Sequence, residues 1–164
     1  MYYKDEYNNL FQNPTSMIIQ ELKLKKITEE ELEYFLNPVP TLEQVKASKL
    51  LSINTKCNKD IISGFKSSAL GEEYFYYSTL EEQSTLTSLI TLGIDSNFKC
   101  QKISVVDNVE VKGNRVQVPH TLAQLKQVLA DGAIHIKAQI DRKDELEVLI
   151  NNAITVDELD GIVW

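Results

Sequence analysis

The sequence predicts an α+β fold: a helical N-terminal region, then two β-hairpins packed against a long C-terminal helix and a short terminal helix. The first observation is a repeated pattern of threonine followed three residues later by Glu or Gln, which is typical of helix starts. The second is a pair of two-residue turn signals, each containing glycine and flanked by strand-like sequence. The third is a long stretch with helical spacing of apolar residues near the end of the chain.

The composition is that of an ordinary globular protein, with 43% hydrophobic and 25% charged residues over a length of 164. The formal net charge is −7 and no element gathers basic side chains, so we expect neither nucleic acid nor a membrane as a partner. The opening residues MYYKDEYNNLFQ lack the pattern of a secretory signal, and no apolar run approaches the roughly 20 residues of a membrane span. Without a signal, the isolated cysteines Cys57 and Cys100 are expected to be reduced and buried.

The first 40 residues are predicted to form a small helical segment, separate from an α+β domain at residues 41–164. Residues 15–26 and 28–36 both carry apolar side chains near helical spacing. The sequence NPVP at residues 37–40 then interrupts the chain, because neither proline can continue a helix. We therefore place the domain boundary after residue 40.

The threonine pattern predicts five helix starts along the chain. In each, the threonine hydroxyl can accept the backbone N–H three residues on, and the Glu or Gln side chain can reach back to the threonine N–H. One such cap contributes about 1 kcal/mol. The pairs are Thr28/Glu31, Thr41/Gln44, Thr79/Glu82, Thr121/Gln124 and Thr155/Glu158.

A first hairpin is predicted in SSALGEEYFYY, residues 67–77, after a helix that begins at Thr41 and ends at Gly64. Gly71-Glu72 suits a two-residue turn, which places Ala69 opposite Tyr74 and each following ring opposite a small residue. Both faces are then apolar, so we expect helices to cover both. One face carries Phe65, Ala69, Tyr74 and Tyr76, and the other carries Leu70, Phe75 and Tyr77.

A second hairpin is predicted around Gly113-Asn114, after a helix that runs from Thr79 to near Gly93. This turn would pair the segment before it with the segment after it, and alternation of valine with polar residues predicts a half-buried strand pair. The valines on the expected buried face are Val109, Val111, Val116 and Val118.

The last predicted elements are a helix from Thr121 to about Asn152 and a short helix from Thr155 towards Trp164. Gly132, in the middle of the long helix, predicts either a close crossing or a break. Its heptad pattern fails at several positions, so a full-length coiled coil is disfavoured, while a partial helix–helix contact between chains stays open.

No catalytic, cofactor or metal site is predicted. His120 precedes a helix cap and His135 lies within a helix, where we expect it to be solvated; neither has a second ligand at a suitable spacing. The aromatic run admits an alternative, because exposed Tyr74, Tyr76 or Tyr77 can stack on sugar rings. Burial in a core is the favoured interpretation, since exposed apolar patches of that size are uncommon.

The segment CNKDIISGFKSSALGEEYFYYSTLEEQSTL resembles one that recurs in tail and tail-fibre proteins of tailed bacteriophages and prophages, and the segment from HTLAQ to TVDELDGIVW is similar to the C-terminal part of the same family. The likeness covers about residues 45–164. Its matching positions in the first segment are Cys57, Ile61, Gly64, Phe65, Ser67, Ala69, Leu70, Gly71, Tyr74, Tyr76, Gln83 and Leu86.

The resemblance implies a non-catalytic structural protein of a phage tail or tail fibre, located in the virion tail or in the host cytoplasm during assembly. Its partners would be other tail proteins and, for some surfaces, further copies of the chain. The alternatives are a tail-fibre assembly chaperone and a glycan-binding adhesin module. The structural or interaction residues expected in these roles are Gly64, Phe65, Gly71, Tyr74, Tyr76, Tyr77 and Trp164.

Overall fold

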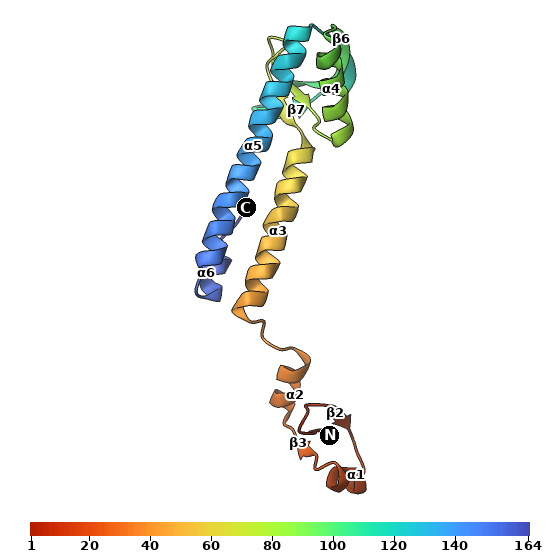
Figure 1. The fold of residues 1–164 in the computed structure, drawn as a ribbon, viewed down its shortest axis with the longest axis vertical. Coiled ribbons are helices and arrows are strands. Elements are labelled where there is room, and N and C mark those ends of the chain that lie inside the picture. The colour runs from red at the N-terminus through yellow and green to blue at the C-terminus, as the bar shows by residue number, and fades with distance from the viewer. The chain divides into compact units, whose positions relative to one another are not determined.

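The computed structural model describes residues 1–164, which divide into two compact units, Met1–Thr41 and Leu42–Trp164. The fold is α+β, as predicted, and the longest helix lies near the C-terminus (Figure 1). None of the helices combines the length and the apolar character needed to cross a membrane.

The N-terminal unit contains the two predicted helices and, in addition, a three-stranded sheet that the sequence analysis did not predict. Its three strands have the order β2-β1-β3, and the helix expected at residues 15–26 ends at Glu21, shortly before Lys23 takes a positive φ of 50°. The elements are β1 (Tyr2–Lys4), β2 (Leu10–Gln12), α1 (Ser16–Glu21), β3 (Lys25–Lys26) and α2 (Glu29–Leu36). Strands this short leave little signal in the sequence.

A pair of long helices dominates the larger unit: α3 (Leu42–Ser63) and α5 (Leu122–Asn152) lie side by side, and α6 (Val156–Asp160) packs against the start of α3 (Figure 1). Their shared core at the α6 end buries Ile53, Ile150, Ala153 and Leu159. Cys57 lies on the same face of α3, buried and unpaired, as is Cys100 in the sheet; both were predicted to be so.

The first hairpin consists of β4 (Phe65–Ser67) and β5 (Tyr74–Tyr76), in a register that differs from the predicted one. Phe65 lies opposite Tyr76 and Ser67 opposite Tyr74, so the connection spans residues 68–73 and the turn predicted at Gly71-Glu72 was wrong. The Ser67 hydroxyl accepts the Ala69 N–H at 3.2 Å, which turns the chain early. The register shift is two residues, so each side chain keeps its predicted face.

The second hairpin also differs from its prediction. After α4 (Leu80–Leu92), the long strand β6 (Ser96–Val106) pairs with β7 (Val109–Lys112) and with β8 (Val116–His120). The turn lies at Asp107-Asn108, both at positive φ, as a tight type I′ connection requires. Gly113-Asn114, predicted as the turn, instead lies between β7 and β8, where the register against β6 shifts by one residue, as in a bulge.

All five predicted helix starts are confirmed: α2, α3, α4, α5 and α6 each begin at the residue after the predicted threonine. The capping box is complete at Thr28 and at Thr121. Helix α5 runs without a break, and its Gly132 marks a close crossing: a Cβ there would lie 2.8 Å from Cζ of Phe65. The larger sheet has the order β4-β5-β6-β7. Its strand β4 contacts α5 through the Phe65 ring.

Candidate functional site

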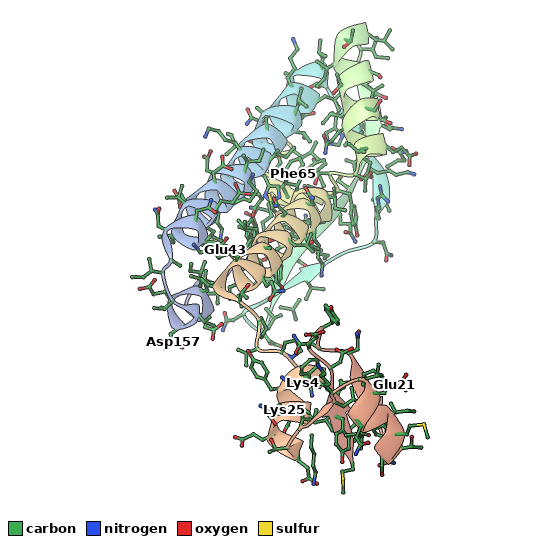
Figure 2. The ribbon with its side chains drawn as sticks, turned by 60° about the horizontal axis from the view of Figure 1, so that its bottom comes forward. Lys4, Glu21, Lys25, Glu43, Phe65 and Asp157 are labelled. Carbon is green, nitrogen blue, oxygen red and sulfur yellow. The ribbon has the colours of Figure 1, made fainter.

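The aromatic strand lies mainly inside the protein. Tyr76 is fully buried and Phe75 is buried, which confirms the core interpretation for these rings, while Tyr74 and Tyr77 keep part of their surface accessible. Phe65 stacks on Tyr76 with ring centroids 5.9 Å apart, and Tyr76 stacks on Phe98 at 6.3 Å. The rings thus form a column between the sheet and α5. Phe65 lies close to the end of α3 (Figure 2).

The polar end of Tyr76 is satisfied inside the core. Its hydroxyl lies 2.9 Å from Nε2 of His120, and Nδ1 of His120 lies 2.7 Å from the Val118 carbonyl oxygen. Because a carbonyl only accepts, Nδ1 carries the proton, and the Tyr76 hydroxyl donates to Nε2. His120 is therefore a buried core residue, although the sequence suggested only a polar position at a helix entry.

His120 makes the stability of the larger unit depend on pH. Burial lowers the pKa of His120, opposed by the hydrogen bond to the Val118 carbonyl. The contribution of neutral His120 to stability is fully present above the pKa of a free histidine, about 6.5. As pH falls below that value, the unfolded chain gains a proton that the folded chain refuses, so the free energy of unfolding falls by up to about 1.4 kcal/mol per pH unit until the lowered pKa is reached.

We expect urea unfolding followed at a series of pH values to show this loss, with His120→Gln removing the histidine contribution to the slope. An unchanged slope in His120→Gln would mean that the imidazole takes up its proton equally in both states.

The other face of the aromatic strand is covered by cations, whereas helices had been expected to cover it. Nζ of Lys112 lies 3.2 Å from the centroid of the Phe75 ring, and the guanidinium of Arg115 lies 4.6 Å from the centroid of Tyr77. Phe75 and Tyr77 also meet edge to face at 5.3 Å. Cation–π contacts of this kind shield the rings, so the accessible surface of Tyr77 is not an open stacking platform.

An exposed apolar surface lies at the turn end of the second hairpin, residues 103–112, which we call the valine hairpin. Val106 lies opposite Val109, and Ser104 lies opposite Val111, so the alternation of a strand places all four on one face. The valines are 55%, 62% and 44% exposed in the order Val106, Val109, Val111. The half-buried face predicted for these valines is therefore wrong at Val109, Val111 and Val116, which are exposed, and correct at Val118, which packs against the core.

The opposite face of the valine hairpin carries the exposed Val105, but its charged residues tie it to the sheet. Glu110 forms an ion pair with Lys66 of β4, and Lys66 also lies 3.5 Å from Glu73. Lys112, on the same face as Glu110, covers the Phe75 ring. The Gln101 amide donates to the Gly113 carbonyl at 2.8 Å, next to the hairpin base. These contacts on three strands hold the valine face in one orientation.

The other residues predicted to have a structural or interaction role are two glycines and the terminal tryptophan. Gly64 follows α3 at a φ of +112°, where a Cβ would meet the Tyr76 carbonyl oxygen at 2.4 Å. Gly71, at a φ of +86°, has open space around it. Trp164 donates its indole N–H to Asp60 at 2.6 Å, and Arg142 lies over its ring. The structure thus brings Gly64, Phe65 and Tyr76 together in one core, with Gly71 and Trp164 apart from it.

Sequence reasoning missed the exposed valine face. The alternation of Val109 and Val111 with Glu110 and Lys112 identified a strand with two unlike faces, but it could not say which face was buried. The available signal was Asp107-Asn108, two residues that tolerate the left-handed region and are flanked by valines on both sides.

The described residues contain no cluster of metal-ligating side chains. The polar groups beside the first hairpin satisfy each other: the buried Ser67 hydroxyl donates to Asp131 at 2.5 Å, and Gln127 donates to the other oxygen of Asp131 at 2.7 Å. This arrangement holds β4 against α5.

A family model described as "Domain of unknown function (DUF4376)" matches residues 44–163. No curated protein and no solved structure matches the chain. The matched segment lies within the larger unit, and the N-terminal unit lies outside it.

Proposed function

The chain belongs to the DUF4376 family of domains of unknown function, and we propose that it is a non-catalytic structural protein of a phage or prophage tail or tail fibre. In this proposal it acts by protein–protein contact, and its contact surface is the valine hairpin. The observation behind the contact surface is the row of exposed valines Val106, Val109 and Val111 on a hairpin fixed from behind. The phage context rests on the sequence likeness to tail and tail-fibre proteins.

The geometry favours a protein partner over a sugar. Valine side chains can form the apolar core of a protein–protein interface. They have no aromatic ring on which a sugar could stack, and they form no hydrogen bonds with a carbohydrate. Of the rings that could stack on a sugar, Tyr76 is buried and Tyr77 has a guanidinium over its face, which leaves only the partly buried Tyr74. We therefore propose another tail or tail-fibre protein, with an apolar surface of its own, as the partner of the valine hairpin.

Val109→Asp tests the contact surface. We expect this variant to recover at least about tenfold less of its tail partner from infected or induced cells, because an uncompensated charge in an apolar contact costs more than 1.4 kcal/mol. The matched control is Leu51→Asp, which places the same charge on a 69% exposed leucine of α3. Both variants should unfold within about 0.5 kcal/mol of the wild type, since both sites are exposed.

Equal recovery of tail protein with Val109→Asp and with the wild type would contradict the proposed contact. Mass spectrometry of purified particles then separates the structural role from its alternative. A tail component is present in mature virions, whereas an assembly chaperone is present in the lysate and absent from the particles.

A further inference from the structure

The N-terminal unit has too little core to be stable alone. Leu24 and Ile27 are its buried residues, and no disulfide can staple it because both cysteines lie in the larger unit. Units of about 40 residues usually need a disulfide, a metal or association to fold. The unit also leaves many large apolar side chains exposed, namely Met1, Tyr7, Leu10, Met17, Ile18, Leu22, Tyr34, Leu36 and Val39.

The two edge strands of its sheet, β3 and β2, differ in charge. The edge strand β3 consists of Lys25 and Lys26, and Lys25 lies opposite Lys4 (Figure 2). Lysines on an edge discourage pairing with another chain. The opposite edge, β2, reads Leu10, Phe11 and Gln12 and carries no charge at all.

The backbone of β2 presents unpaired groups along that edge. The Asn13 N–H donates to the Met1 carbonyl at 2.9 Å, and the Asp5 N–H donates to the Asn9 carbonyl at 3.2 Å. Along an antiparallel strand pair, opposite residues alternate between hydrogen-bonded and non-hydrogen-bonded pairs. Phe11 is therefore hydrogen-bonded to β1, while the N–H and C=O groups of Leu10 and Gln12 point away from β1. No other strand of the chain pairs with β2.

We propose that the N-terminal unit pairs with the same unit of a second copy of the chain, β2 against β2, in antiparallel orientation about a two-fold axis at Phe11. Leu10 then lies opposite Gln12 of the second copy, and the outward N–H and C=O groups of both residues are all satisfied. The two Phe11 residues face each other as a non-hydrogen-bonded pair, the closer kind.

The second copy fits this edge better than an unrelated strand does. The edge is its own complement in length and hydrogen-bonding pattern, as a two-fold contact requires. Pairing of β2 with β2 places uncharged residues opposite uncharged residues, in a unit otherwise rich in lysine and glutamate. No like charges therefore lie opposite each other across this interface. Asn8 and Asn13, at φ of 66° and 47°, end the strand on both sides and oppose a slipped register.

The test compares two substitutions at one position in the full chain. Gln12→Pro removes an outward N–H that β1 does not use, whereas Gln12→Val keeps that N–H and favours a strand. In sedimentation equilibrium we expect the wild type and Gln12→Val to show twice the mass of the single chain, and Gln12→Pro to show the mass of one chain. A monomeric wild type at millimolar concentration, or a dimeric Gln12→Pro, would overturn the proposal.

A cysteine at the axis tests the register directly. Phe11→Cys places two thiols at a Cα separation of about 4.5 Å, within the range that a disulfide spans. We expect a disulfide-linked dimer after mild oxidation, and no such dimer from Tyr34→Cys, which is exposed elsewhere in the unit. Failure of Phe11→Cys to cross-link in a dimeric sample would exclude this pairing. The proposal does not depend on the phage assignment or on the valine hairpin.

Discussion

Gly64→Ala is expected to lower the free energy of unfolding of the larger unit by about 3 kcal/mol or more. Two costs combine at this position. The φ of +112° is unfavourable for any residue with a Cβ, and that Cβ would lie 2.4 Å from the Tyr76 carbonyl oxygen and 2.5 Å from Cζ of Phe75. The carbonyl belongs to β5 and the ring is buried, so neither can move aside without disturbing the sheet. Urea unfolding followed by the fluorescence of Trp164 measures the loss.

Gly71→Ala is the matched control. Gly71 also has a positive φ, of +86°, but nothing lies within 4 Å of its added Cβ, so only the backbone cost of about 1–2 kcal/mol is expected. Equal losses in the two variants would show that the chain relaxes around Gly64, and the close packing of the α3 end against β5 would then be less rigid than the contacts indicate.

Tyr76→Ala is expected to destabilise the larger unit by about 3–5 kcal/mol, because it leaves a cavity in the middle of the ring column. Tyr76 contacts Phe65 on one side and Phe98 on the other and has no exposed surface. Chemical unfolding measures the effect, and near-ultraviolet circular dichroism reports the disturbed packing of the neighbouring rings.

Tyr76→Phe separates packing from hydrogen bonding. It keeps the ring but leaves Nε2 of His120 buried without its donor, which costs about 1–3 kcal/mol. A ligand-binding role for Tyr76 predicts a different pattern, in which Tyr76→Ala keeps nearly full stability and loses a fluorescence response to a sugar. That pattern would contradict a structural role for the ring.

Local chemistry explains which parts of this fold could be predicted. The helix starts at Thr28, Thr41, Thr79, Thr121 and Thr155 were all correct, because a cap is decided by a few neighbouring residues. The faces of the first hairpin were also correct, since strand alternation survives a shift of two residues.

Strand pairing was predicted poorly because it depends on residues far apart in the sequence. Gly113-Asn114 is a stronger turn signal than Asp107-Asn108 when each is considered alone. The choice between them was made by β6, which pairs with β7 and β8 along its length. In the first hairpin, the Ser67 hydroxyl donates to Asp131 of α5, a partner from a distant part of the chain that the local sequence does not show.

The candidate contact surface was missed for a related reason. A period of two distinguishes the faces of a strand, but burial depends on what packs against each face. Here Lys66 and the Phe75 ring contact Glu110 and Lys112 on one face, and Val106, Val109 and Val111 on the other face stay exposed.

Site-specific photo-crosslinking measures most directly whether the valine hairpin contacts a partner. A photoreactive residue at Val109, placed in the chain as it assembles in infected or induced cells, is expected to cross-link to a tail or tail-fibre protein. The same residue at Leu51, exposed on α3, is expected to give no such product. Cross-linking of tail protein from Leu51 but not from Val109 would contradict the proposed contact surface.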